Sequence, residues 1–404
     1  MLGAIIGDIV GSVYESNNTK DYNFHLLTSR SRFTDDTVMT LAVAKWLTED
    51  GEHTHEHLVK CMREMGLKYS WAGYGSKFKR WLIKREPKPY NSWGNGSGMR
   101  VSPVGLYAHS LDECLELAKI SAEVTHNHPE GIKGAQAIAA SIFLSRQEKS
   151  KEEIRTYIED TFGYDLHRTI DCIRPDYTFD VSCMGSVPEA IIAFMDSHDF
   201  ESAIRNAVSI GGDSDTIAAM AGGIAQVAYG LPKALSGYCY GLLTPELRHI
   251  LDDFEKKLEM TKSDPFNLER FVKMQEYDYA AALNEMKRGH KESHWIWYVF
   301  PQLRGFGHSS NSWIYGIADI DEAKAYLSHP ILGKRLREIT TALLPHKEKN
   351  VDQLMGSHVD GTKLLSSMTL FDAVSPNDIF AQVLTTFFNG KRDNRTLNKI
   401  NGNG

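Results

Sequence analysis

Two acidic clusters lie far apart in this chain, and each stands at the start of an apolar stretch with helical spacing. The first is Thr34-Asp35-Asp36-Thr37 and the second is Asp213-Ser214-Asp215-Thr216, so 176 residues separate Asp36 from Asp213. Carboxylates this dense cannot share a small volume as bare anions, because like charges a few ångströms apart raise one another's pKa until a proton or a cation intervenes. If the fold brings the two clusters together, they therefore predict divalent metal.

The side chains available in the two clusters are carboxylates and hydroxyls, without cysteine. Oxygen ligands favour hard ions such as Mg²⁺ or Mn²⁺ over zinc. Helix capping is the alternative interpretation of each cluster alone, because Ser, Thr and Asp are good N-caps and acidic groups suit helix starts. A cap needs only one such side chain, however, whereas each cluster offers three or four. Gly211-Gly212 before the second cluster also permits a tight backbone approach.

The N-terminal apolar segment supplies a third element. Gly3, Gly7 and Gly11 form a stripe of small residues that lets another helix pack close, and Asp8, Gly11 and Glu15 fall on one helical face. We expect a buried helix here. Glu15 closes the apolar segment where the chain turns polar, so its carboxylate is a candidate general base or substrate anchor beside a metal site.

Five motifs follow one another along about the first 250 residues. They are Gly7-Asp8 through Glu15, Phe33-Thr34-Asp35-Asp36-Thr37, Asn95-Gly96-Ser97-Gly98-Met99-Arg100, Thr125-His126-Asn127-His128-Pro129 and Gly211-Gly212-Asp213-Ser214-Asp215-Thr216. In this combination they resemble the ADP-ribosylglycohydrolases, which include the dinitrogenase reductase-activating glycohydrolase and the ADP-ribosyl-acceptor hydrolases. The resemblance implies a compact all-α domain with a binuclear Mg²⁺ or Mn²⁺ site at the base of an ADP-ribose cleft.

The resemblance also assigns roles to individual residues. The implied ligands of the two ions are Thr34, Asp35, Asp36, Asp213, Asp215 and Thr216. The implied catalytic residues are Glu15, Asp36 and Asp215. The segment that would hold the diphosphate and distal ribose comprises Asn95, Gly96, Ser97, Gly98 and Met99, with His126 placed near the substrate. The implied reaction is hydrolysis of the bond between C1 of the distal ribose and an acceptor atom, through an oxocarbenium-like transition state.

Length and composition favour a soluble chain of two domains. The chain has 404 residues, of which 42% are hydrophobic, and it exceeds the size of a typical single core. No apolar stretch reaches the ~20 residues of a membrane helix, and Asp8 interrupts the first apolar run, which has no basic segment before it. The five cysteines include no closely spaced pair. We therefore expect a cytoplasmic protein without a membrane partner.

We expect a catalytic domain over residues 1–255, a linker over residues 256–266 and a second domain over residues 267–398. Residues 1–266 carry 28 Lys and Arg against 37 Asp and Glu, and residues 267–404 carry 17 against 15. Neither part has the basic footprint of a general nucleic-acid binder.

The second domain resembles a family of small, mainly helical bacterial domains of unknown function. The resemblance rests on Ser293–Gly305, on Tyr326-Leu327 with His329–Gly333, and on Lys363–Phe371. Its dense aromatic residues favour a core role. Four polar residues lie among them, and basic groups beside aromatic faces suit a nucleotide or ADP-ribose. These residues are Lys291, His294, Arg304 and Lys363.

Two classes of function follow. The first is a metal-dependent hydrolase that removes ADP-ribose from a modified protein or small molecule and releases ADP-ribose as product. The second is a non-catalytic ADP-ribose binding module or scaffold whose metal site is structural. Glu15 and all six implied ligands are present, which favours the enzyme. A variant of the first keeps the chemistry and takes ADP-ribosylated nucleobases or small ADP-ribose esters as substrates.

Overall fold

The computed structural model describes residues 1–49, 51–307 and 309–401. Its regular structure is helical, and the described residues contain no strand, only two isolated bridges, Gly94 with Ser182 and Leu303 with Ile317. This confirms the expected all-α class. The chain divides into two compact units, Met1–Lys262 and Ser263–Gly404. No helix among the described residues is long and apolar enough to cross a membrane.

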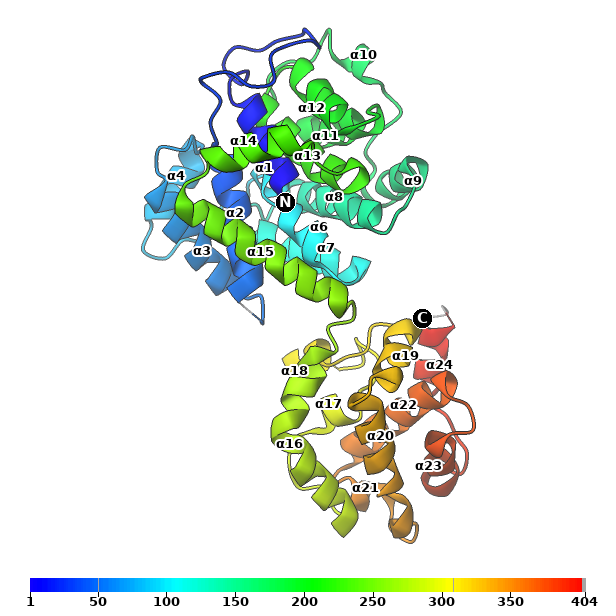
Figure 1. Ribbon diagram of the computed structural model, residues 1–404. Helices are drawn as coiled ribbons and strands as arrows, with labels where there is room; N and C mark the ends of the chain where they lie inside the picture. Colours follow the sequence, from blue (N-terminus) through cyan, green and yellow to red (C-terminus); the bar gives the residue numbers. More distant parts are fainter. Residues whose placement is uncertain (50, 308, 402–404) are drawn as a thin grey trace. The chain divides into compact units, whose positions relative to one another are not determined.

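The first unit is a helical assembly around one large apolar core (Figure 1). Its helices are α1 (Leu2–Gly11), α2 (Asp35–Glu49), α3 (His55–Lys68), α4 (Ser76–Ile83), α5 (Gly96–Met99), α6 (Ser102–Tyr107), α7 (Leu111–Glu123), α8 (Pro129–Arg146), α9 (Lys151–Phe162), α10 (Ile170–Ile173), α11 (Cys183–Met195), α12 (Phe200–Ser209), α13 (Ser214–Tyr229), α14 (Lys233–Leu242) and α15 (Pro245–Ser263).

Helices α1 and α13 pack backbone against backbone at the centre of this unit. A Cβ atom built on Gly3 would lie 2.4 Å from the carbonyl oxygen of Gly222. A Cβ on Gly7 would lie 2.0 Å from the carbonyl oxygen of Ala218, and one on Gly11 would lie 2.4 Å from Cα of Asp215. The predicted stripe of small residues thus meets a helix from 200 residues later in the chain, and it fixes the start of α13 beside the end of α1.

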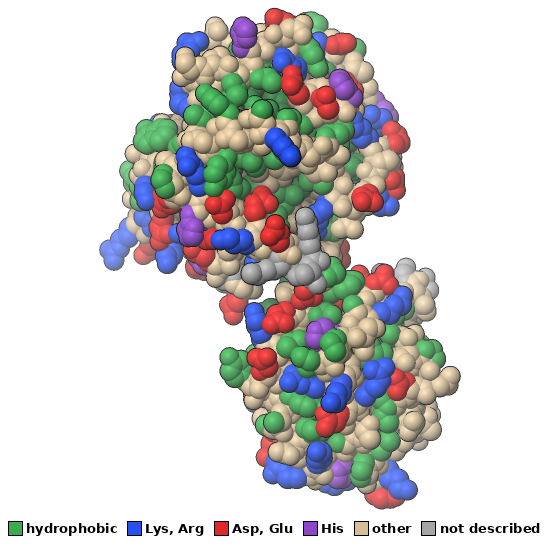
Figure 2. All heavy atoms as spheres, in the orientation of Figure 1, with side chains coloured by type: hydrophobic (Ala, Val, Ile, Leu, Met, Phe, Trp, Pro, Cys, Tyr) green, Lys and Arg blue, Asp and Glu red, His purple; other side chains and the backbone are tan. Residues whose placement is uncertain are grey.

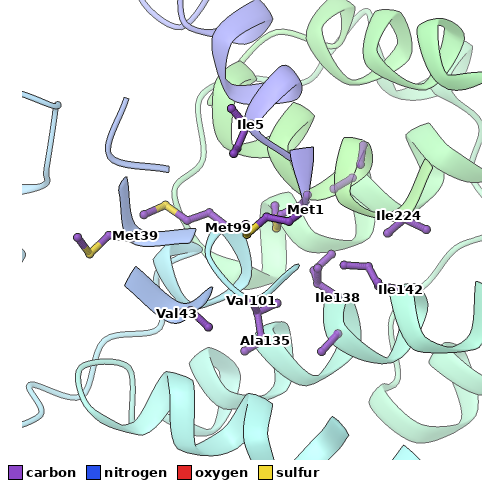
Figure 3. Close-up of a cluster of buried hydrophobic side chains, with 14 of the residues drawn as sticks. Met1, Ile5, Met39, Val43, Met99, Val101, Ala135, Ile138, Ile142 and Ile224 are labelled. Atoms are coloured by element: carbon purple, nitrogen blue, oxygen red, sulfur yellow. The ribbon is translucent and has the colours of Figure 1, made fainter. Parts of the chain in front are cut away.

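The core reaches under the short helix α5. Figure 3 shows Met99 and Val101 among side chains from α1, α2, α8 and α13, including Ile5, Val43 and Ile138. All of these side chains are buried. A four-residue helix has little stability of its own, so this packing is what holds α5 in place.

Both acidic clusters begin helices, as the sequence predicted. Helix α2 starts at Asp35, and α13 starts at Ser214 with Asp213 at the N-cap position. The backbone N–H of Ile217 donates to the carbonyl oxygen of Asp213 at 3.0 Å. The side chain of Asp213 makes no cap hydrogen bond, whereas Oδ1 of Asp215 accepts from the N–H of Thr216 at 2.9 Å within the first turn. The carboxylate of Asp213 is therefore not used as a helix cap.

The segment expected to be a linker, residues 256–266, is helical over much of its length. Helix α15 continues to Ser263, because its amphipathic pattern persists and Leu258 still packs against the core of the first unit. Only a few residues then precede the first helix of the second unit.

The second unit has its own helical core, in which Trp295, Tyr298 and Phe371 are buried. Figure 2 shows basic and acidic side chains interspersed on the visible face of each unit. The second unit contains α16 (Glu269–Arg288), α17 (Ile296–Val299), α18 (Ser310–Ile314), α19 (Ile320–Ser328), α20 (Leu332–Thr341), the 3₁₀ helix η1 (Leu344–His346), α21 (Val351–Leu354), α22 (His358–Val374), α23 (Ile379–Phe388) and α24 (Asn394–Ile400).

Candidate functional site

The two acidic clusters meet in the folded chain. Carboxylate oxygens of Asp8, Asp36 and Asp215 lie within 4.8 Å of one another, and all three residues are buried. The hydroxyl of Thr216 donates to Oδ2 of Asp36 at 3.3 Å and so bridges the starts of α2 and α13. The fold therefore brings together two clusters that 176 residues separate in the sequence.

A second group of carboxylates adjoins the first. Glu15, Asp213 and Asp215 also bring oxygens within 4.8 Å of one another, so Asp215 belongs to both groups. Helix α1 ends at Gly11, and Glu15 lies in the turn that follows it. The N–H of Glu15 donates to the carbonyl oxygen of Gly11 at 3.1 Å. Glu15 is only half-buried, unlike the aspartates, which gives it access to the solvent side of the group.

Asp8 is a member of the site that our list of ligands lacked. Its carboxylate accepts hydrogen bonds from the N–H of Thr34 at 2.9 Å, from the hydroxyl of Thr34 at 2.7 Å and from the N–H of Thr37 at 3.1 Å. The hydroxyl of Thr37 also donates to it. Asp8 thus fixes the first turn of α2. An acidic residue inside an otherwise apolar helix was the sequence signal for this role.

The aspartates of the site have raised pKa values. Burial raises the pKa of Asp8, Asp36 and Asp215, and neighbouring carboxylates raise that of Asp36 and Asp215 further. Burial, and then the charge of Asp8, raise the pKa of Asp35 to about 7. Oδ1 of Asp36 is buried and has no hydrogen-bond partner among the described residues. An all-oxygen donor set with an unpaired carboxylate oxygen fits a hard divalent cation.

A cleft of about 490 Å³ opens above these carboxylates. Its lining combines acidic groups, small residues and aromatic rings, and Lys77 and Arg100 are its only Lys or Arg among the described residues. Those that line it are Glu15, Asp35, Asp36, Met39, Gly73, Gly75, Ser76, Lys77, Phe78, Tyr90, Ser92, Trp93, Gly94, Asn95, Gly96, Met99, Arg100, His126, Phe179, Val181, Asp213, Asp215 and Thr216.

The glycine-rich segment forms one wall of the cleft as the helical turn α5, not as an open loop. The amide of Asn95 donates to Oδ2 of Asp213 at 2.6 Å, and its N–H donates to the carbonyl oxygen of Val181 at 2.8 Å. Asn95, Gly96 and Met99 line the cleft. This wall is therefore tied both to the carboxylates and to the neighbouring segment that contains Val181.

Ser97 and Gly98 face the interior instead of the cleft. Ser97 is fully buried, and its hydroxyl donates to the carbonyl oxygen of Gly131 at 2.6 Å. A Cβ on Gly98 would lie 3.0 Å from the sulfur of Met220. Neither residue lines the cleft, because alternate positions of a helical turn point in different directions. Both positions are thus packed against neighbouring elements.

His126 lies where the sequence placed it, on the cleft wall. Its Nδ1 is 2.7 Å from the hydroxyl of Thr125, and a Cβ on Gly96 would lie 3.1 Å from its Nε2. Burial, and then the nearby Arg100 cation, hold the pKa of His126 well below its ordinary range. The imidazole is therefore neutral at neutral pH.

The loop that delivers Asp213 needs two left-handed glycines. Gly211 and Gly212 have φ of 76° and 71°, and a Cβ on Gly212 would lie 2.5 Å from the ring of Tyr177. Asn18 fastens this loop to the segment after α1: its amide donates to the carbonyl oxygens of Glu15 at 2.9 Å and Gly212 at 3.0 Å. The predicted tight backbone approach is present.

The remaining expected ligand, Thr34, is buried behind the cleft wall rather than on it. Its hydroxyl donates to Asp8 and lies 3.4 Å from Oδ2 of Asp36. The same oxygen accepts from the N–H of Asp36 at 3.3 Å, so one of its two lone pairs remains for a cation.

In the second unit, two of the four polar residues singled out in the sequence form internal ion pairs. The ammonium groups of Lys291 and Lys363 lie 2.7 Å and 3.0 Å from the carboxylate of Asp360. A cavity beside Lys363 and Trp297 has about 10 Å³, which is room for about one water molecule and not for a nucleotide. The aromatic residues of this region serve chiefly as core.

Two family models match this chain. Residues 1–263 match the model described as ADP-ribosylglycohydrolase, and residues 265–400 match the model described as a protein of unknown function, DUF1810. The human protein ADP-ribosylhydrolase ARH3 is 26% identical over 321 residues, covering 60% of this chain and 88% of the relative.

A bacterial relative and two solved structures are also similar. The ADP-ribosylarginine hydrolase Tri1 of Pseudomonas putida is 26% identical over 269 residues, covering 57% of this chain and 70% of the relative. The conserved hypothetical protein Rv1873 from Mycobacterium tuberculosis is 40% identical, with a TM-score of 0.33 over 34% of this chain and 98% of that one. An ADP-ribosylglycohydrolase-related protein complex is 24% identical, with a TM-score of 0.49 over 64% of this chain and 97% of that one.

Proposed function

The chain belongs to the ADP-ribosylglycohydrolase family, and we propose that its first unit hydrolyses the bond at C1 of the distal ribose in an ADP-ribosylated acceptor. It is a glycohydrolase enzyme. The observation that carries the proposal is the meeting of two carboxylate groups, one around Asp36 and one around Asp213, at the base of a single cleft.

The residues present fit two divalent ions, Mg²⁺ or Mn²⁺. The ligands we propose are Thr34, Asp35, Asp36, Asp213, Asp215 and Thr216. Their oxygens form a dense anionic set, and the unpaired oxygen of Asp36 supports cation binding there. When bound, such ions neutralise the carboxylates, orient ribose hydroxyls and lower the pKa of water. Asp8 would shape this site from behind, because four hydrogen bonds commit it to the start of α2.

Glu15 is the proposed general base. Burial, and then the charges of Asp213 and Asp8, raise its pKa above the ordinary value of a glutamate. A raised pKa brings the carboxylate closer to the range in which it accepts a proton efficiently at neutral pH. Its half-buried position beside the cleft suits removal of a proton from the attacking water. Asp36 and Asp215 would stabilise the positive charge that develops on the ribose.

Substrate positioning is assigned to the wall built by α5. Asn95 and Gly96 line the cleft, and the absence of a side chain at Gly96 lets an oxygen of the substrate come close to the backbone. The aromatic side chains of Trp93 and Phe179 extend the cleft outward and are well exposed. They offer flat apolar surface to a base or to part of the acceptor.

The test is release of free ADP-ribose from a panel of ADP-ribosylated arginine, serine and nucleobase substrates and from a small ADP-ribose ester. The panel is run with Mg²⁺, with Mn²⁺ and with EDTA, beside the double variant Asp213→Ala/Asp215→Ala. Release that needs metal and is lost in the variant supports the proposal and identifies the acceptor. Binding of ADP-ribose without release from any substrate overturns the hydrolytic proposal and favours a binding module.

A further inference from the structure

We propose that Arg100 and Thr125 lock His126 in the neutral tautomer that carries its proton on Nε2, so that the imidazole presents a fixed hydrogen-bond donor to a substrate oxygen. Arg100 and Thr125 are then positioning residues that act through His126. The part of this inference that names ADP-ribose as the ligand rests on the proposed function.

The first step is the direction of the hydrogen bond between Arg100 and Thr125. The terminal nitrogen Nη2 of Arg100 lies 2.8 Å from the hydroxyl of Thr125 and 2.8 Å from the carbonyl oxygen of Ser121. A guanidinium group has donors and no acceptor. The hydroxyl oxygen of Thr125 must therefore accept from Arg100, and its own proton is free to be donated elsewhere.

The second step is where that proton goes. Thr125 is fully buried, and Nδ1 of His126 lies 2.7 Å from its hydroxyl. No other acceptor for this hydroxyl is found among the described residues. The opposite arrangement, with Nδ1–H donating to Thr125, would leave a buried hydroxyl proton without an acceptor, which is costly. Thr125 therefore donates to Nδ1, and a neutral His126 carries its proton on Nε2.

The third step is the direction in which Nε2 points. His126 lines the cleft, and its Nε2 lies beside Gly94 and Gly96, which line it too. Cβ atoms built on these glycines would lie 3.7 Å and 3.1 Å from Nε2. The bond from Thr125 is the only hydrogen bond of the imidazole within the described part of the chain. The Nε2–H is therefore an unused donor beside the two glycines of the cleft wall.

The hydrogen bonds that run from Arg100 through Thr125 to His126 also affect the strength of the Nε2–H donor. The Arg100 cation is buried, and burial together with this cation disfavours a second proton on His126. Hydrogen bonds in a chain polarise one another, so the cation at one end strengthens the donor at the other. The cleft thereby gains a donor for a substrate oxygen at a wall that is otherwise close to several carboxylates.

The first test is nuclear magnetic resonance of the full-length chain with ¹⁵N-labelled histidine at neutral pH. The His126 signals are assigned by their loss in His126→Gln, and couplings to the ring carbon protons distinguish the tautomers. We expect a neutral ring with its proton on Nε2. A proton on Nδ1, or a doubly protonated ring, would overturn the proposal.

The second test uses the matched variants Thr125→Val, which keeps the shape and removes the hydroxyl, and Thr125→Ser, which keeps the hydroxyl. Calorimetric affinity for ADP-ribose should fall by about tenfold in Thr125→Val, the loss expected for one weakened hydrogen bond. Thr125→Ser should retain both the Nε2 tautomer and the affinity. Equal affinity in wild type and Thr125→Val would refute the role in binding.

These outcomes are separable from failure of the proposed function. The chain could release no ADP-ribose from any acceptor and yet bind it through an Nε2-protonated His126. That result would support the roles of Arg100 and Thr125 and overturn the hydrolytic proposal. Circular dichroism shows whether Thr125→Val is folded. If it is not, the wild-type spectrum and the Thr125→Ser affinity decide the matter without it.

Discussion

Gly7 and Ala218 mark the point where α1 and α13 touch through their backbones, since a Cβ on Gly7 would lie 2.0 Å from the carbonyl oxygen of Ala218. Asp8 follows Gly7 on α1, and Asp215 begins the same helix as Ala218. The closeness of these two helices thus determines whether the carboxylates from both ends of the unit can meet.

Gly7→Ala is expected to lower the free energy of unfolding of the first unit by about 1–3 kcal/mol or more, because the added methyl group forces the two helices apart. Gly237→Ala is the matched control. Gly237 lies in α14, and a Cβ built on it would have nothing within 4 Å. The control should be neutral or stabilising by up to about 1 kcal/mol. Equal losses in urea titrations of both variants would show that the close packing is not the cause.

Asp36→Asn should stabilise the metal-free protein and remove its response to metal. Replacing a buried carboxylate crowded by Asp8, Asp35 and Asp213 relieves repulsion, and we expect a gain of about 1–2 kcal/mol. Thermal denaturation with EDTA should therefore show a higher Tm for the variant than for wild type. Added Mg²⁺ or Mn²⁺ should raise the wild-type Tm only. If metal raises the Tm of the variant as much as that of wild type, Asp36 is not a ligand.

The stability of the metal-free protein should depend on the protonation of Asp35. Burial raises the pKa of this carboxyl in the folded state from 3.8 to about 7. Between these two pH values the folded state binds more protons than the unfolded state. The stability that protonation of Asp35 gives to the folded state is therefore lost as the pH rises from about 4 to about 7. Its upper limit is about 4 kcal/mol.

Other carboxylates also titrate in this window, so the informative quantity is the difference in unfolding free energy between wild type and Asp35→Asn in EDTA. As the pH rises, the wild type should become less stable relative to Asp35→Asn. Parallel pH curves for the two proteins would mean that Asp35 has the same pKa in the folded and unfolded states. Saturating Mg²⁺ should flatten the difference if Asp35 is a ligand.

Glu15→Gln should reduce kcat for ADP-ribose release by about 10²–10⁴, the range associated with general acid and base catalysis. The affinity for ADP-ribose should change little, because the amide keeps the size of the side chain. Single-turnover kinetics beside calorimetric binding measures the two effects separately. A loss of affinity with unchanged kcat would make Glu15 a substrate anchor instead of a base.

Neighbouring residues of α5 should differ in what they affect. Ser97→Ala removes a buried hydrogen bond to Gly131 and should cost about 1–2 kcal/mol of stability with little change in ADP-ribose affinity. Gly96→Ala places a Cβ 3.1 Å from Nε2 of His126 and should weaken ADP-ribose binding with little change in stability. Chemical denaturation and calorimetry of both variants check this crossed pattern, which the reverse result would contradict.

The sequence predicted those features that depend on local pattern. The helix starts at Asp35 and Ser214 followed from acidic clusters before apolar helical spacing, and the packing of Gly3, Gly7 and Gly11 followed from their regular interval. The five motifs and their order were enough to identify the family. These signals lie within a few turns of one helix or in the order of short motifs, so no knowledge of long-range contacts is needed to see them.

Other features required the folded chain. The role of Asp8 depends on Thr34 and Thr37, which reach it only when α1 and α2 cross. That Ser97 faces inward depends on Gly131, which begins a distant helix. The pairing of Lys291 with Asp360 in the second unit likewise joins residues far apart in sequence. A side chain's polarity indicates that it needs a partner, but it does not say which one.

Asp215 contributes to both carboxylate groups, and its helix comes long after α1 and α2 in the sequence of the first unit. During synthesis, the ribosome therefore completes α1 and α2 long before it releases the last carboxylates they are to join. Until α13 emerges, the glycine stripe of α1 has no partner and the acidic start of α2 faces only half of its site. The nascent chain can neither form the proposed metal site nor act on a substrate before almost the whole unit has been made.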